Sequence, residues 1–278
     1  MTKKDTFYIF DNVGDFVEWL RKTKKTKKGQ ALAHSERTDN YSQNFSGTES
    51  FEAAQELLDN GDATLSRMIM EQAVSIKAKS KTGCMRSNGT VNSPQGFVPN
   101  IGAYMTGHPN NMVNIRQTFK PMSKVLSIVY NISVNRRITT NQMISAATKV
   151  ACAISTLEAK GYRVNVYVGS YTRNYHSRAK KNAGGFIMKI KDAGKPLDPL
   201  RIAYPLANPS MLRRHGFAFL ERVDFKLPSD YGTPASVPSN ILQREIGNHI
   251  SLSAMNIIER DNTFEAIAKE IEEQSNKA

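Results

Sequence analysis

Residues 125–168 constrain the fold of this 278-residue chain more than any other part of it. Val125–Ile132 is apolar at odd and even positions alike, which is typical of a parallel strand buried on both faces. An amphipathic helix capped by Thr139 or Thr140 follows, and Tyr162–Val168 comes directly after it as a second strand. A strand, a helix and a strand in this order predict a parallel sheet with a right-handed crossover.

The remaining sequence predicts further elements around that unit. Near the N-terminus, a short strand or turn precedes a helix that begins at Val13 and is capped by Asp11 or Asn12. Residues 29–47 are polar and residues 83–114 are rich in Gly, Pro and Asn, so both are expected to be irregular connections. Ser46 begins a capping-box pattern. Additional helices are expected at 51–58, 62–79, 210–220, 241–246 and 264–274, and additional strands at 186–190, 200–206 and 249–257.

These elements predict an α/β protein with a three-layer, mostly parallel sheet of the Rossmann-like kind. The expected organisation is a basic, helical N-terminal region at residues 1–114, the α/β domain at 115–260 and an acidic C-terminal helix at 261–278. No apolar run approaches the ~20 residues of a membrane-spanning helix, and residues 1–10 lack the apolar core of a signal peptide. With only Cys84 and Cys152, the chain fits a reducing cytoplasm.

The charge balance indicates the class of partner. Thirty-eight Lys and Arg residues against twenty-five Asp and Glu leave a net charge of +13. An excess of this size favours polyanions such as nucleic acid, while a basic surface kept for solubility is the alternative. Residues 21–28 hold six of the positive charges without an apolar residue. We expect this run to be solvated, either touching nucleic acid nonspecifically or acting as a flexible tether.

The loop after the second strand is the most suggestive surface element. Residues 169–181 mix tyrosines with cations, a combination in which aromatic faces stack on unpaired bases while cations follow phosphates. In a parallel sheet this loop shares an edge with the residues after the first strand. The alternative is an edge loop whose tyrosines rest on the core. The predicted nucleic-acid-binding residues are Arg136, Arg137, Tyr171, Arg173, Tyr175, Arg178, Lys180 and Lys181.

A second basic cluster, Arg213-Arg214-His215, follows the 200–206 segment. It either joins the same face or reflects the favourable placement of cations at a helix end.

The end of the first strand, Asn131-Ile-Ser133-Val-Asn135, resembles that of a von Willebrand factor A domain, in which Asp-x-Ser-x-Ser precedes a long amphipathic helix. The resemblance covers residues 125–168 and extends loosely to residue 256. Ser133 matches the first Ser, while Asn131 replaces the Asp and Asn135 the second Ser. The family's loop holds a divalent ion, and the neutral Asn131 removes the anionic anchor that such an ion needs. We therefore expect no metal here and a structural loop instead.

A wider resemblance concerns uncharacterised bacteriophage proteins that combine a basic N-terminal run, a helical pair and a degenerate A-type domain. It is carried by Phe51–Gly61 and Ala146–Val168, where Leu157-Glu-Ala-Lys-Gly-Tyr-Arg-Val164 joins helix to strand. It implies a phage-encoded protein and no established activity.

No enzyme motif or cofactor site stands out in the sequence. The P-loop, Gly-x-Gly-x-x-Gly and Gly-x-Ser-x-Gly patterns do not occur, and the five histidines lack zinc spacing. The favoured function is therefore a non-enzymatic, cytoplasmic nucleic-acid-binding protein with no cofactor. The alternative is a protein-interaction or assembly module that binds protein through the face at the strand ends of an A-type domain, with the positive charge steering an acidic partner. An enzyme with an unrecognised site is the third hypothesis, and the form of nucleic acid and the oligomeric state stay open.

Overall fold

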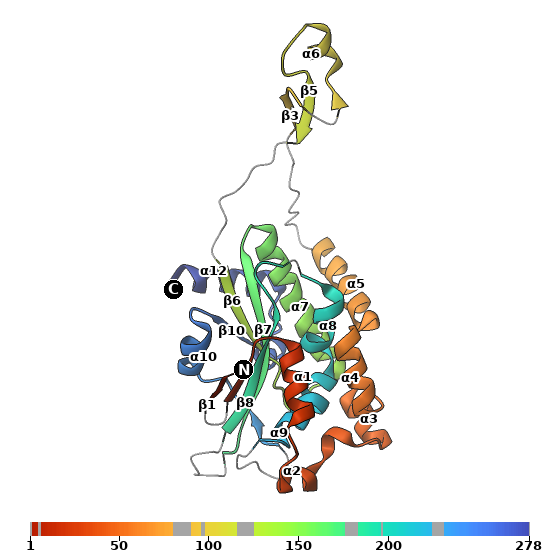
Figure 1. Ribbon diagram of the computed structural model, residues 1–278, viewed down its shortest axis with the longest axis vertical. Coiled ribbons are helices and arrows are strands. Elements are labelled where there is room, and N and C mark those ends of the chain that lie inside the picture. The colour runs from red at the N-terminus through yellow and green to blue at the C-terminus, as the bar shows by residue number, and fades with distance from the viewer. Residues whose placement is uncertain are drawn as a thin grey trace. The chain divides into compact units, whose positions relative to one another are not determined.

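The structure is a computed structural model that describes residues 2–4, 7–79, 90–95, 98–115, 125–175, 183–195, 197–223 and 231–277 (Figure 1). The chain forms two compact units, residues 1–76 together with 124–278, and residues 77–123. This division corrects the predicted boundaries, because residues 1–76 and the C-terminal helix belong to the same unit as residues 124–260. Within the described residues, no helix has the length and apolar character needed to cross a membrane.

The first unit is an α/β structure with a mostly parallel central sheet (Figure 1). Along the sheet the order is β1 (Thr2–Lys4), β2 (Phe7–Phe10), β8 (Ala183–Lys191), β7 (Arg163–Arg173), β6 (Val125–Asn131) and β10 (Ile250–Ser253), with β9 (Thr233–Pro234) on β7. The pairs β2–β8, β6–β7 and β6–β10 are parallel, whereas β1–β2, β7–β8 and β7–β9 are antiparallel.

The predicted strand, helix and strand are confirmed as β6, α7 (Thr140–Ala159) and β7, with β6 and β7 parallel. Thr139 begins the helix through a capping box, in which its hydroxyl accepts from the Gln142 N–H while the Gln142 side chain accepts from the Thr139 N–H. The strands and the helix of this unit depend on local periodicity, and the start of the helix depends on a local cap, which is why they could be predicted from the sequence.

The two faces of the sheet bury different clusters. Side chains alternate along each strand, so Tyr8 and Phe10 face the larger cluster while Phe7 and Ile9 face the smaller one. The larger cluster contains apolar residues of α7 and of the helices α1 (Val13–Lys22), α8 (Pro199–Ala207), α9 (Phe217–Leu220), α11 (Ala254–Arg260) and α12 (Phe264–Lys277). The smaller cluster is completed by Leu242 of α10 (Ser239–Ile246), a helix the sequence predicted at 241–246.

The N-terminal residues contribute to the sheet rather than to a separate helical region. Strand β2 pairs with β8, and α1 (Val13–Lys22) begins at the predicted cap Asn12. The expected loop at 29–47 is wrong, because Thr26 and Asp39 cap short helices there. The following helix is capped by Ser50 rather than Ser46. The elements are α2 (Lys27–Leu32), η1 (His34–Glu36), α3 (Asn40–Ser46), α4 (Phe51–Asn60) and α5 (Ala63–Lys79).

The C-terminal half contains one element of the wrong predicted type. Residues 200–206 form part of helix α8 (Pro199–Ala207) instead of a strand, because Asp198 caps it and Pro199 occupies its first turn. The predicted strand 249–257 is divided between β10 and α11 (Ala254–Arg260). The other helices are η2 (Met211–Gly216), a π-helical segment, α9 (Phe217–Leu220) and α12 (Phe264–Lys277).

The second unit contains regular structure where an irregular connection was expected. Its three antiparallel strands lie in the order β3 (Thr90–Ser93), β5 (Met112–Ile115) and β4 (Val98–Pro99). The short helix α6 (Ile101–Met105) follows β4, and the Asn100 side chain accepts from the Ala103 N–H at its start. The strands are short and join residues distant in sequence, so single-sequence periodicity does not reveal them.

Candidate nucleic-acid interface

The loop after β6 is tied to the end of β7. Asn131 lies opposite Gly169 in the parallel register. Beyond that point the buried Ser133 hydroxyl lies 2.9 Å from the Ser170 hydroxyl and accepts a 2.9 Å hydrogen bond from the Tyr171 N–H. The two chain segments that follow these strands therefore emerge at the same edge of the sheet.

The residues of the degenerate metal-site loop are engaged with protein groups. Asn131 donates from its amide to the Ala235 carbonyl at 2.8 Å and accepts from the Ser133 N–H at 3.0 Å. The Asn135 side chain accepts from the Arg137 N–H at 3.3 Å. Short polar side chains here close the strand end, as Asx turns do. In the parts of the chain that the structure describes, no group of three or more His, Cys, Asp or Glu side chains could hold a metal ion.

Three arginines are exposed at this edge. Arg136 and Arg137 lie in the loop between β6 and α7, and Arg173 ends β7. Among the described residues none of the three has an ion-pair partner. The Arg173 guanidinium lies 5.3 Å from the ring centroid of Tyr175, whose side chain is 61% exposed. We call Arg136, Arg137, Arg173 and Tyr175 the strand-end face.

Tyr171 does not belong to this face, which corrects the sequence prediction. Strand β7 continues to Arg173 because β8 and β9 both pair with its last residues, so Tyr171 lies in the strand rather than in the loop. Its ring points into the smaller core cluster, 5.9 Å from the ring of Phe7, and burial raises the pKa of its hydroxyl. The predicted residues Arg178, Lys180 and Lys181 lie outside the described residues.

The Arg213-Arg214-His215 cluster is buried, so it does not join the surface. Arg213 donates to the carbonyls of Phe45 and Ile138 at 2.6 and 2.8 Å, and desolvation lowers its pKa to about 10. Arg214 is only 1% exposed and donates to carbonyls of the N-terminal segment. These two guanidiniums fasten residues 35–48 to η2, which is a structural role.

The basic run at 21–28 is also partly structural. Arg21 and Lys22 end α1, and Thr26 caps α2. The Lys25 side chain is only 13% exposed and forms ion pairs with Glu36 at 2.8 Å and with the fully buried Glu221 at 3.0 Å. The prediction of a wholly solvated run is therefore wrong at Lys25, because a buried carboxylate brought by a distant segment holds it.

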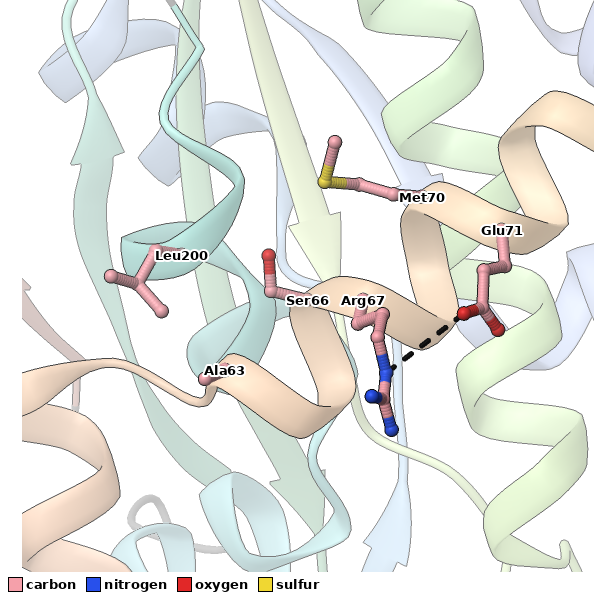
Figure 2. A pocket seen from close by; sticks show the side chains of 6 residues that line it. All are labelled: Ala63, Ser66, Arg67, Met70, Glu71 and Leu200. Carbon is pink, nitrogen blue, oxygen red and sulfur yellow. Dashed lines mark ion pairs between the residues drawn. The ribbon is translucent and has the colours of Figure 1, made fainter.

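Two hollows elsewhere on the first unit have a different character. One is a groove of about 560 Å³ between α5 and α8, where Met70 and Leu200 are exposed. Figure 2 shows the side chains that line it, including the Arg67–Glu71 ion pair. A hollow of about 810 Å³ lies at the ends of β2 and β8, lined by both cations and carboxylates. Its Lys189 and Arg201 lie 3.9 and 3.8 Å from Asp192 and Asp198. Charge is therefore balanced in both hollows, unlike on the strand-end face.

The basic residues are distributed very unevenly along the chain, a signal that the prediction from total charge did not use. Residues 72–191 contain eighteen Lys and Arg and a single acidic residue, Glu158, whereas the rest of the chain contains twenty basic and twenty-four acidic residues. The whole positive excess therefore belongs to one continuous segment. This segment includes the strand-end face and all of the second unit.

Comparison with known protein families identifies a match over almost the whole chain. A family described as "Domain of unknown function (DUF7192)" matches residues 1–277. No curated protein and no solved structure matches the chain.

Proposed function

The chain belongs to the DUF7192 family, a domain of unknown function, and we propose that it is a non-enzymatic nucleic-acid-binding protein. The observation that carries the proposal is the strand-end face. Arg136, Arg137 and Arg173 are exposed together at one edge of the sheet, inside the segment that holds the positive excess. Cations without nearby carboxylates attract phosphates, and binding releases the counterions that surround a nucleic acid.

The tyrosine on this face adds a contact that phosphate attraction alone does not provide. Arg173 lies over one side of the Tyr175 ring, and most of that side chain is open to solvent. An unpaired base stacks on such a ring while the arginine reaches the adjacent phosphate. Arg178, Lys180 and Lys181 follow Tyr175 closely in sequence and would extend the contact along the strand.

The proposal extends to the architecture. The parallel β6–α7–β7 unit, with Asn131, Ser133 and Asn135 after the first strand, supports a von Willebrand factor A-like arrangement. Apolar clusters on both sheet faces support its three-layer form. In this proposal the loop has exchanged ion binding for hydrogen bonds to β7 and Ala235, and the protein is phage-encoded and acts in the host cytoplasm.

A salt series tests the face directly. Replacing Arg136, Arg137 and Arg173 by Ala is expected to flatten the slope of log affinity against log salt by about 2–3 units, because each lost phosphate contact contributes about 0.7–0.9. The measurement uses nuclease-treated protein with labelled single-stranded DNA, duplex DNA and RNA.

A matched control removes the same charge elsewhere. Arg67, Arg201 and Arg244 are exposed arginines that already lie beside carboxylates, so the triple Ala variant at these positions should keep nearly the wild-type slope. Equal slopes for the two triple variants would exclude the strand-end face as the binding surface.

The alternative function is a protein-interaction module for an acidic partner, which the apolar groove of Figure 2 favours because Met70 is 54% and Leu200 40% exposed. Tyr175→Ala separates the two functions. It should weaken nucleic-acid binding about 5- to 100-fold if a base stacks on the ring. It should leave attraction of an acidic protein nearly unchanged, because it removes no charge. Intact oligonucleotide binding by Tyr175→Ala would remove stacking from the proposal.

A further inference from the structure

The second unit has a composition that restricts its partners. Residues 77–123 contain no Asp or Glu, and their six basic residues are Lys77, Lys79, Lys81, Arg86, Arg116 and Lys120. All six lie before residue 90 or after residue 115, so they flank the residues that form the small sheet and α6. Between them, the unit is nearly free of charge.

Helix α6 presents an apolar face to solvent. Ile101, Tyr104 and Met105 are spaced so that they share one side of the helix, and their side chains are 70, 69 and 81% exposed. No described residue makes a ring contact or a side-chain hydrogen bond with Tyr104. The large side chains of this face are therefore not part of a buried core that stabilises the unit.

The backbone beneath this face is well fixed. The Asn100 N–H donates to the Asn111 carbonyl at 2.8 Å, and the His108 N–H donates to the Ala103 carbonyl at 2.9 Å. Gly107 makes the turn between them with a φ of +70°, a conformation that favours glycine. The face is thus held in position before any partner binds, which lowers the entropic cost of binding.

We propose that the second unit binds single-stranded nucleic acid, with an unpaired base stacked on Tyr104. The side chains of the six flanking cations lie outside those that the structure describes, so they enter the proposal only through their charge in the sequence. The proposal rests on the proposed function and adds a form of nucleic acid and a second contact site to it. Ile101 and Met105 supply apolar surface for the neighbouring base. The charge of residues 77–123 favours nucleic acid over a protein as the partner, because six cations without a carboxylate attract a polyanion more strongly than they attract an ordinary protein surface.

Single strands are favoured over duplexes by the nature of the exposed side chains. A tyrosine ring stacks only on a base whose face is accessible, and in a duplex the faces are already stacked. Residues 90–95 and 98–115, which form the small sheet and α6, carry no Lys or Arg that could follow both strands of a duplex. Stacking is therefore expected to discriminate between the two forms, whereas the flanking charges attract both.

The test uses the full chain with Tyr104→Ala and the conservative variant Tyr104→Phe. The probes are a labelled oligothymidylate of about 30 nucleotides and a duplex of similar length. Tyr104→Ala is expected to weaken single-strand binding about 5- to 100-fold, the range measured for loss of one stacked base, and Tyr104→Phe less than about 2-fold. Duplex binding should change little. Because the side chain is exposed, the thermal unfolding midpoint of both variants should match that of the wild type.

A second readout locates the contact. Ultraviolet cross-linking of an iodouracil-substituted single strand should attach the nucleic acid to Tyr104 or Met105. Cross-links confined to other parts of the chain would overturn the proposal, as would a Tyr104→Ala variant that binds the single strand like the wild type. An equal loss on the duplex would overturn the preference for single strands.

Failure of the Tyr104 proposal can be distinguished from failure of the proposed nucleic-acid-binding function. If the wild type binds oligonucleotides and only the strand-end triple variant weakens binding, the second unit is excluded and the strand-end face is retained. If the wild type binds no oligonucleotide near physiological salt, both proposals fail together, and an acidic protein partner becomes the explanation of the charge.

Discussion

Replacement of Glu221 by Ala is expected to lower the free energy of unfolding by about 3–5 kcal/mol, because it removes one partner of a buried ion pair. The Glu221 side chain has no exposed area, and its carboxylate lies 3.0 Å from the Lys25 ammonium. It also accepts hydrogen bonds from the Ser35 N–H at 3.0 Å, the Ser35 hydroxyl at 2.6 Å and the Tyr231 hydroxyl at 2.6 Å. Truncation leaves these donors without their acceptor.

Urea denaturation of the variant measures this effect, and an exposed ion pair supplies the control. Glu18 pairs with Lys22 on the surface of α1, where both side chains are more than half exposed. Glu18→Ala should therefore cost no more than about 0.5 kcal/mol. A cost below about 1 kcal/mol for Glu221→Ala would mean that the carboxylate does not fasten the N-terminal segment to the rest of the first unit.

Acidification below pH 6.5 should destabilise the protein through His215. Complete burial lowers the pKa of this imidazole from 6.5 to about 3. Between these values the unfolded chain binds a proton that the folded protein excludes, so stability falls as the pH falls. The loss from this residue is about 1.4 kcal/mol per pH unit and approaches completion near pH 3.

The hydrogen bonds around His215 agree with a neutral ring. The Gln55 amide donates to Asp59 at 3.0 Å, which leaves its oxygen to accept from His215 Nε2 at 3.2 Å. His215 Nδ1 then accepts from the Tyr204 hydroxyl, 2.9 Å away. One proton on Nε2 satisfies both side-chain partners, Gln55 and Tyr204, so these hydrogen bonds do not require the charged ring.

The variant His215→Gln tests the acid effect through the slope of stability against pH rather than through its absolute value. From pH 6.5 to 4 the slope should be shallower than that of the wild type by about 1 kcal/mol per pH unit. Parallel curves for the wild type and His215→Gln would show that this residue does not govern acid sensitivity.

Elements with local determinants could be predicted from the sequence. The cap at Asn12, the capping box at Thr139 and the apolar stripe of α7 depend on residues a few positions apart, and the structure has them. The 200–206 helix was mistaken for a strand because a short apolar run suits either element. Its type was decided by the cap at Asp198 and by the burial of Tyr204 and Leu206 among segments far away in sequence.

The candidate site was predictable to the extent that it depends on strand order. Parallel pairing of β6 and β7 brings Arg136, Arg137 and Arg173 to one edge, and that pairing was expected from the crossover. The burial of two other residues could not be predicted. Tyr171 is buried because β7 continues past it, and Arg214 is buried because residues 35–48 supply carbonyl acceptors. Charge alone made Arg213 and Arg214 look like surface residues, since buried arginines are rare.

The pairing of β2 with β8 has a consequence for the way the chain is synthesised. Phe7 lies opposite Gly185, so β2 has only β1 as a strand neighbour until translation has passed the residues of β8. At the usual 5–20 residues per second, this interval lasts on the order of ten to forty seconds. During it Phe7, Tyr8, Ile9 and Phe10 are without the strand that later holds them. Contacts of such long sequence separation slow folding, so the β2 segment of the nascent chain is a natural binding site for chaperones.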